Sequence, residues 1–214
     1  MKKPILLIIA GPQSSGKTTI WKLLKKHYRS ATFIDETNQY TVQDKKHLGA
    51  AYVDKDLEAK IIRADIKKIT GINKPVKLVI IETSIFHSLY SEALGDEKKA
   101  HVFYSEYLRS FRRFKPKVLF IDTKPLISWK RRKKYYLGRI KKAGINDRQQ
   151  KSEMLKKYKN KIFQLYPFWI KYYQALPFPK IRVKNSSKPY KKFIAEVLNR
   201  LDKIPTIPQQ NETL

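Results

Sequence analysis

The sequence feature that most constrains the fold is a glycine-rich octapeptide near the amino terminus. It satisfies the pattern G-x-x-x-x-G-K-[ST] and consists of Gly11, Pro12, Gln13, Ser14, Ser15, Gly16, Lys17 and Thr18. An almost unbroken Ile/Leu run over residues 4–10 precedes it, as expected of a strand covered on both faces. Residues 18–28 follow with apolar side chains at helical spacing. A strand, this loop and a helix, in that order, predict a phosphate-binding loop (P-loop).

Each residue type in the octapeptide has a chemical reason to be there. The glycines let successive backbone N–H groups converge on phosphate oxygens, and the helix that starts at the loop adds a favourable dipole. Lys17 is expected to reach the β- and γ-phosphates, the Thr18 hydroxyl to ligate Mg²⁺, and Thr19 to extend the loop. The sequence therefore predicts a site for a nucleoside triphosphate with its magnesium ion.

Apolar runs alternate with amphipathic segments along the rest of the chain. Further strands are expected at residues 31–34, 76–81, 118–121 and 180–183, and further helices at 57–69, 84–93, 98–114, 126–137, 146–174 and 188–201. This alternation predicts an α/β protein with the three-layer P-loop NTPase fold, a mainly parallel five-stranded sheet flanked by helices. We expect one domain over residues 1–204 and a frayed tail over 205–214.

Proline and glycine residues interrupt the helical pattern at two places. Pro167 lies inside residues 146–174, which form either one kinked helix or two helices. Gly138 and Gly144 are expected to loosen the chain after residues 126–137.

Acidic residues close three of the predicted strands. Asp35 and Glu36 follow the second strand, Glu82 the third and Asp122 the fourth. The carboxyl ends of parallel strands form the ligand crevice of such sheets, so these side chains are expected near the P-loop. Glu82 has the strand-then-carboxylate form of a Walker B element and is a candidate Mg²⁺ ligand, directly or through water. Each carboxylate alone fits a helix cap or a solvated loop equally well, but together they favour a functional role for Glu36 and Glu82.

The net charge of +29 is concentrated in the second half of the chain. Residues 108–214 hold 29 of the 47 Lys and Arg and only 6 of the 18 acidic residues. Residues 109–142 alone hold 14 basic residues and a single acidic one. This excess favours a phosphorylated or polyanionic partner, although a general lysine bias explains the composition equally well.

Several kinds of site are excluded or disfavoured by composition. The chain has no cysteine, which excludes disulfides, thiolate metal sites and a cysteine nucleophile, and fits a reducing, cytoplasmic compartment. No apolar run approaches the roughly 20 residues that a membrane span needs, and residues 1–10 are better explained as a strand than as a signal peptide. The four histidines show no metal-ligand spacing.

Four segments resemble the deoxynucleoside kinases and the related thymidylate kinases, in the same order along the chain. They are residues 11–18, 33–36, 80–85 and 119–122. The basic segment 129–134 lies where those enzymes carry an arginine-rich lid, expected here over about residues 124–146. The resemblance implies ATP-dependent transfer of a γ-phosphoryl group to a nucleoside, deoxynucleoside or nucleoside monophosphate. Lid candidates for stabilising the transferring charge are Arg131, Arg132 and Arg139.

The resemblance also implies roles for two acidic residues. In the deoxynucleoside kinases a Glu that closes the second strand acts as general base on the attacking hydroxyl, and Glu36 matches that position. A Glu after the lid often holds the sugar 3′-hydroxyl, and Glu153 is the candidate, although an exposed helix position fits Glu153 as well. The family usually has Arg directly after the acid that Glu82 matches. Thr83 stands there, so a phosphate contact must come from elsewhere or the acceptor differs.

The alternative is a nucleic-acid-binding P-loop protein, either a polynucleotide 5′-hydroxyl kinase or an RNA-regulated NTPase. Basic and aromatic side chains adjoin in residues 133–136, as they do on nucleic-acid surfaces. The aromatic residues of 158–173 fit helix packing better than a stacking platform. A homodimer is a further partner that the sequence leaves open.

Overall fold

The computed structural model describes residues 3–36, 55–73, 75–185 and 189–202. Within them five strands form one sheet in the order β2-β3-β1-β4-β5, with every neighbouring pair parallel. The strands are β1 (Ile5–Ala10), β2 (Thr32–Ile34), β3 (Leu78–Glu82), β4 (Lys115–Asp122) and β5 (Lys180–Lys184). The central strand β1 therefore has β3 on one side and β4 on the other, and the strand order reverses there.

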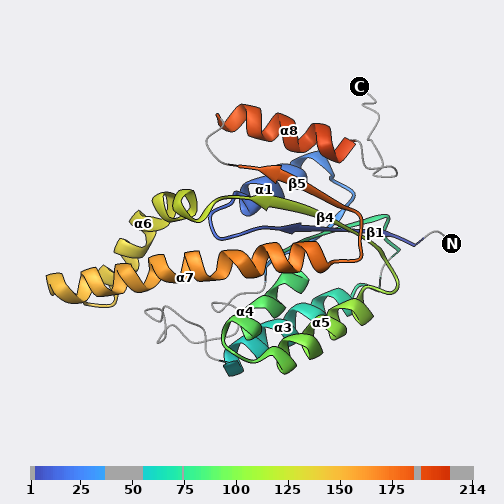
Figure 1. Ribbon diagram of the computed structural model, residues 1–214. Coiled ribbons are helices and arrows are strands. Elements are labelled where there is room, and N and C mark those ends of the chain that lie inside the picture. The colour runs from blue at the N-terminus through green and yellow to red at the C-terminus, as the bar shows by residue number, and fades with distance from the viewer. Residues whose placement is uncertain (1–2, 37–54, 74, 186–188, 203–214) are drawn as a thin grey trace.

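Helices cover both faces of this sheet (Figure 1). They are α1 (Lys17–His27), α3 (Lys55–Thr70), the 3-10 helix η2 (Ser84–His87), α4 (Ser88–Ala93), α5 (Glu97–Ser110), α6 (Pro125–Lys142), α7 (Arg148–Ala175) and α8 (Tyr190–Asp202). Helices α1 and α8 lie on one face, and α3, α4, α5 and the long α7 lie on the other. The three-layer α/β fold is confirmed, with a sheet that is wholly parallel.

Both faces of β1 are buried, which explains its unbroken apolar run. Leu6 and Ile8 join the core under α3, α4, α5 and α7, whereas Leu7 and Ile9 join the core under α1 and α8. A strand covered on one face would alternate apolar and polar residues, and β1 has no polar residue. Burial of each such side chain contributes roughly 1.5–3 kcal/mol.

Helix α6 differs from expectation, because it continues through Gly138 to Lys142. Tyr136 and Ile140 lie on either side of that glycine, and both are buried against Tyr158 and Ile162 of α7. This packing outweighs the cost of about 1 kcal/mol that a glycine imposes on a helix interior. The prediction that Gly138 loosens the chain was therefore wrong.

Helix α7 is one helix of 28 residues with Pro167 inside it. The residues on either side, Leu165 and Trp169, are buried, and the Trp169 ring stacks on Phe86 with 5.3 Å between centroids. Packing on both sides holds the helix together where proline removes a backbone hydrogen bond. The predicted segment 84–93 is instead divided into η2 and α4, and the predicted frayed tail lies outside the described residues.

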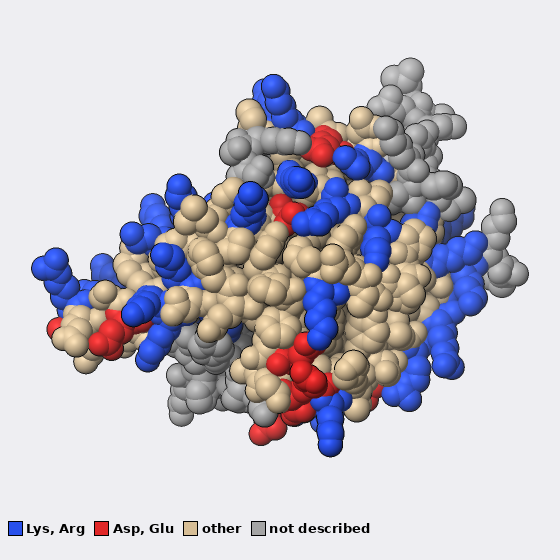
Figure 2. All heavy atoms as spheres, in the orientation of Figure 1, with Lys and Arg blue, Asp and Glu red and all other residues tan. Residues whose placement is uncertain are grey.

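Lys and Arg are spread widely over the face shown in Figure 2, from the end formed by α6 and α7 to the opposite edge. A group of acidic side chains interrupts them near α4. Among the residues that the structure describes, no helix is both long and apolar enough to cross a membrane.

Candidate functional site

The octapeptide links β1 to α1 through a backbone that requires its glycines. Gly11 has φ 149° and Gly16, which caps α1, has φ 102°. A Cβ at Gly11 would lie 2.3 Å from the carbonyl oxygen of Ile121 on β4. No larger residue fits at that distance. The lack of a side chain at Gly11 therefore allows the loop to pack directly against the end of β4.

Lys17 and Thr18, the first residues of α1, point to different partners. Lys17 Nζ donates to the carbonyl oxygens of Gly11 and Pro12, at 2.9 and 3.4 Å, and lies 5.6 Å from the centre of the Trp169 ring. Thr18 Oγ1 donates to Glu82 Oε1 at 2.9 Å. The two side chains that the sequence offers as Mg²⁺ ligands are therefore within hydrogen-bond distance of each other.

The pair fits a magnesium ion by its chemistry. Mg²⁺ prefers hydroxyl, carboxylate and phosphate oxygens and is typically held by one or two protein ligands together with substrate phosphates. Burial raises the pKa of Glu82, and the nearby Lys17 ammonium opposes that rise. Within the described residues no cluster of three or more His, Cys, Asp and Glu offers an all-protein metal cage.

Helix α6 is attached directly to the P-loop. Ser128 Oγ donates to the Gln13 carbonyl at 2.7 Å, and Tyr136 OH donates to Gln13 Oε1 at 3.2 Å. The Tyr136 ring stacks on Tyr158 of α7 with 4.1 Å between centroids. The loop, α6 and α7 therefore form one connected wall of the site.

Asn185 connects β5 to the same loop. Its Nδ2 donates to the Ser15 carbonyl at 2.7 Å, and its Oδ1 accepts from Arg131 Nη2 at 3.2 Å. Arg131 Nη1 also donates to the Ser14 carbonyl at 3.2 Å. The guanidinium of Arg131 thus bonds to the protein, and Arg131 does not line the cavity described below.

A cavity of about 520 Å³ opens between the P-loop, α3, α4, α6 and α7. It brings together the P-loop residues 13–19, both candidate carboxylates Glu36 and Glu82, and two of the three lid candidates, Arg132 and Arg139. Its remaining lining residues are Glu58, Ile61, His87, Tyr90, Ala93, Leu94, Tyr135, Tyr136, Tyr158, Lys161 and Leu165. Glu153 is not among them: it is exposed on α7 and accepts from Gln149 Nε2 at 3.3 Å.

Glu36 follows β2 and is held by Thr83, whose Oγ1 donates to Glu36 Oε1 at 2.7 Å. Burial alone would raise the pKa of Glu36, but the charge of Lys17, the Thr83 hydrogen bond and Arg132 together hold it below its usual value. The ionised form of Glu36, the residue to which the resemblance assigns the role of general base, is therefore favoured.

Three further titratable side chains lie in the half of the cavity formed by α3, η2 and α7. Burial raises the pKa of Glu58 to about 8 and lowers the pKa values of His87 and Lys161, to about 4 and about 8. His87 Nδ1 lies 3.7 Å from Glu58 Oε1. Among the described residues, neither Glu58 Oε1 nor His87 Nε2 has a hydrogen-bond partner, and both side chains are almost fully buried.

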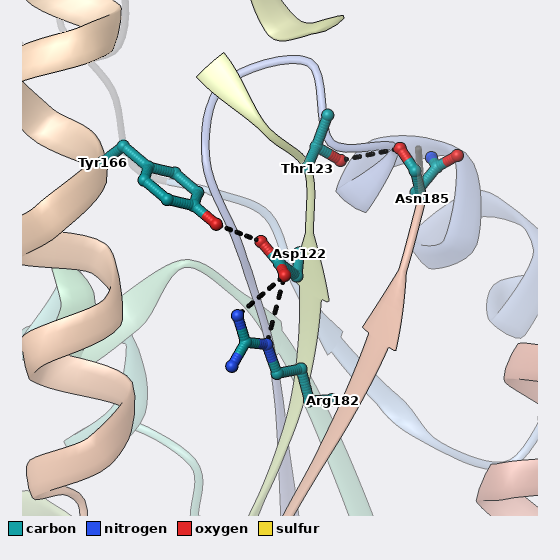
Figure 3. A network of polar contacts seen from close by, with 5 residues as sticks. All are labelled: Asp122, Thr123, Tyr166, Arg182 and Asn185. Carbon is teal, nitrogen blue, oxygen red and sulfur yellow. Dashed lines mark hydrogen bonds and ion pairs between the residues drawn. The ribbon is translucent and has the colours of Figure 1, made fainter. Parts of the chain in front are cut away.

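Asp122, the acid that ends β4, is held by a network of polar contacts with neighbouring side chains (Figure 3). Its Oδ2 accepts from Arg182 Nε and Nη2 at 3.1 and 2.8 Å, and its Oδ1 accepts from the Tyr166 hydroxyl at 2.9 Å. These contacts join β4, β5 and α7. Neither Asp122 nor Asp35 lines the cavity, so of the four acids that close strands only Glu36 and Glu82 line it.

Sequence reasoning missed Asn185, Glu58, His87 and Lys161. For Asn185 a signal existed, since it lies two residues after the last predicted strand, 180–183, at the edge where ligands bind. Glu58 and Lys161 lie on amphipathic helices rich in charge, where nothing in the pattern separates them from their solvated neighbours.

The fold is shared with solved kinases. A deoxyadenosine kinase from M. mycoides with bound dATP aligns at 16% identity and a TM-score of 0.58, covering 92% of this chain and 98% of that one. The same enzyme with the products dCMP and dCDP aligns at 15% identity and a TM-score of 0.56, covering 93% of this chain and 100% of that one. A thymidylate kinase from Ehrlichia chaffeensis aligns at 12% identity and a TM-score of 0.55, covering 94% of this chain and 99% of that one.

At these identities the structures establish a common fold. A search among curated protein sequences found no match. The profile of the deoxynucleoside kinase family, however, matches residues 7–204, nearly the whole chain. These findings do not favour the nucleic-acid alternative. The chain is a P-loop phosphotransferase and belongs to the deoxynucleoside kinase family.

Proposed function

We propose that this chain transfers the γ-phosphoryl group of ATP to the 5′-hydroxyl of a nucleoside or deoxynucleoside, in the presence of Mg²⁺. One observation carries the proposal: Glu36 lies in the same cavity as the P-loop, near Lys17, with its pKa held down. A carboxylate so placed accepts the proton of a hydroxyl as that oxygen attacks phosphorus.

The charges in the cavity favour an uncharged acceptor over a nucleoside monophosphate. Glu36, Glu58 and Glu82 all line the cavity, and the family's usual arginine is replaced by Thr83. An acceptor phosphate would bring two further negative charges towards these carboxylates, at an energetic cost in a partly buried site. A nucleoside hydroxyl carries no charge and needs only a base.

The transfer step follows from these positions. The proton of the 5′-hydroxyl moves to Glu36 while a bond forms between the 5′-oxygen and the γ-phosphorus. The bond from that phosphorus to the β,γ-bridging oxygen breaks, and ADP leaves with its electron pair. Lys17, Arg132 and Arg139 line the cavity and would stabilise charge on the transferring group.

Thr18 and Glu82 would hold Mg²⁺, which neutralises charge on the β- and γ-phosphates when bound. We assign the lid to α6 and the turn after it, about residues 124–146, because α6 is bonded to the P-loop and lines the cavity. The relatives support a deoxynucleoside acceptor: one is a deoxyadenosine kinase that was solved with dCMP as product.

The proposal is tested by measuring ADP release from MgATP. The panel contains the common nucleosides and deoxynucleosides, their 5′-monophosphates, and 5′-hydroxyl DNA and RNA oligomers. Nucleosides should give the highest kcat/KM, with formation of the nucleoside 5′-monophosphate checked by mass spectrometry. ADP release with oligomers alone would overturn the proposal in favour of a polynucleotide kinase.

A matched pair of lysine variants on α1 controls the assay. Lys17→Ala removes the P-loop cation and should lower kcat by at least about 10²-fold. Lys22→Ala removes an exposed lysine from the same helix and should leave kcat within about twofold. Equal activity in the two variants, both folded, would contradict a phosphate role for the loop.

A further inference from the structure

Thr83 combines a short hydrogen bond with an unusual backbone conformation. Its Oγ1 donates to Glu36 Oε1 at 2.7 Å, and its backbone has φ 67° and ψ −67°. A positive φ is uncommon outside glycine and is an outlier for a β-branched residue. Such conformations cost on the order of 1–3 kcal/mol and cluster at functional sites, where the surrounding structure holds them.

Neighbouring backbone contacts hold this conformation in place. The Thr83 N–H donates to the Ile9 carbonyl at 2.9 Å, which extends the pairing of β1 and β3 by one residue. The Thr83 carbonyl accepts from the Phe86 N–H at 3.3 Å as η2 begins, and Ser84 also has a positive φ, of 49°. The chain therefore turns abruptly from β3 into η2, and Thr83 is buried at that turn.

The hydrogen bond determines how Glu36 presents its carboxylate. Among the described residues, Thr83 is the one group that donates a hydrogen bond to Glu36. Within the described part of the chain it occupies Oε1 and leaves Oε2 to accept a proton. A hydroxyl orients the carboxylate without adding positive charge, whereas a directly bonded guanidinium would lower its basicity further.

We propose that Thr83 is a positioning residue: it holds one oxygen of Glu36 so that the other meets the acceptor hydroxyl, and the strained turn after β3 serves to place its side chain there. This inference rests on the proposed function of Glu36 as base. It assigns a role to the residue that stands where the family usually has arginine.

The test uses substitutions that separate the hydroxyl from the backbone. Thr83→Val keeps the shape and removes the hydroxyl, so kcat should fall by about 10- to 100-fold while the KM for ATP stays within about threefold. Thr83→Ser keeps the hydroxyl and should keep kcat within about threefold. A folded Thr83→Val enzyme with wild-type kcat, or a Thr83→Ser enzyme as impaired as Thr83→Val, would overturn the inference.

Thr83→Gly adds a measurement that does not depend on the folding of the valine variant. Glycine adopts a positive φ without strain, so the midpoint of thermal unfolding should rise or stay equal although a side chain is lost, while kcat falls as in Thr83→Val. A clear drop in the unfolding midpoint together with unchanged kcat would mean that Thr83 serves stability alone.

The double variant Glu36→Gln/Thr83→Val distinguishes failure of this inference from failure of the proposed function. If Thr83 acts through Glu36, the double variant should have the same kcat as Glu36→Gln alone. Independent, multiplying losses would overturn the positioning role and leave the base assignment standing. Full activity of Glu36→Gln would instead overturn the proposed function.

Discussion

The two halves of the cavity treat their ionisable groups in opposite ways. In the P-loop half, Lys17 bonds to the loop carbonyls, Glu82 accepts from Thr18, and Arg131 bonds to the loop and to Asn185. In the other half, Glu58 Oε1 and His87 Nε2 are buried without a hydrogen-bond partner among the described residues. The ionisable groups of the P-loop half are therefore bonded within the protein, whereas two of those in the other half have buried polar atoms without a partner among the described residues.

This difference indicates how each half binds. A preformed loop binds phosphates with little reorganisation, which favours a donor site that is the same for every acceptor. A buried polar atom without a partner costs about 1–3 kcal/mol, and a ligand that supplies the partner regains that free energy. We therefore expect the half formed by α3, η2 and α7 to select the acceptor. Its unpartnered polar atoms should lower the stability of the protein without a ligand.

Among the substitutions that distinguish the two halves, Glu36→Gln is expected to have the largest effect on activity. Without a carboxylate to accept the hydroxyl proton, kcat should fall by about 10²- to 10⁴-fold. The KM for ATP should stay within about threefold, because the P-loop half is untouched. Steady-state ADP release at saturating nucleoside measures both. A large rise in the KM for ATP with unchanged kcat would place Glu36 in the donor half instead.

The next effect compares two adjacent arginines of α6. Arg132 lines the cavity, so Arg132→Ala should lower kcat by about 10- to 100-fold with little change in stability. Arg131 bonds to Ser14 and Asn185, so Arg131→Ala should chiefly raise the KM for ATP and lower the unfolding midpoint by a few degrees. A larger loss of kcat in Arg131→Ala than in Arg132→Ala would contradict the assignment of Arg132 to the cavity and of Arg131 to the support of the loop.

The framework of the P-loop half could be read from the sequence, because it depends on local patterns. A glycine-rich loop between a buried strand and a helix has one common structure, and a carboxylate at the end of a parallel strand lies at the ligand edge. Those rules placed Glu36 and Glu82 at the edge of the sheet where the cavity lies. They could not separate Asp122, which ends its strand in the same way but bonds to Arg182 and Tyr166.

The other half could not be predicted, because its contacts depend on how distant helices pack. Glu58 and Lys161 lie on α3 and α7, more than 100 residues apart, and each occurs in a charged helix with no distinguishing pattern. The long-range hydrogen bond from Thr83 to Glu36 has the same origin. Even the continuity of α6 through Gly138 follows from its packing on α7 and not from helix propensity.

A smaller, pH-dependent effect is expected from Glu58→Gln. The pKa of Glu58 is about 8 in the folded protein, against a usual value of 4.5, so between these values the folded state keeps a proton that the unfolded state has lost. The contribution of Glu58 to wild-type stability should therefore fall as the pH rises from 4.5 to 8. The glutamine variant lacks this loss, and its unfolding midpoint should exceed that of wild type by about 2–8 °C at pH 8.

The same comparison at pH 4 provides the control. There Glu58 is protonated in both states, so the two midpoints should converge in differential scanning calorimetry. A constant difference across the pH range would mean that packing, and not protonation, distinguishes the variant.

The smallest effect is expected from Glu153→Gln. Glu153 is exposed and bonds to Gln149 on its own helix, outside the cavity. Its substitution should change kcat/KM for a nucleoside by no more than about twofold and leave the unfolding midpoint within about 1 °C. A loss of tenfold or more in kcat/KM would restore a sugar-binding role to this residue.

The most direct test of the central claim compares one deoxynucleoside with its own 5′-monophosphate as acceptor, in wild type and in Glu36→Gln. We expect the wild-type enzyme to release ADP with the deoxynucleoside, to release far less with the monophosphate, and to lose the first activity in Glu36→Gln. A preference for the monophosphate that survives Glu36→Gln would contradict a carboxylate that activates an uncharged hydroxyl.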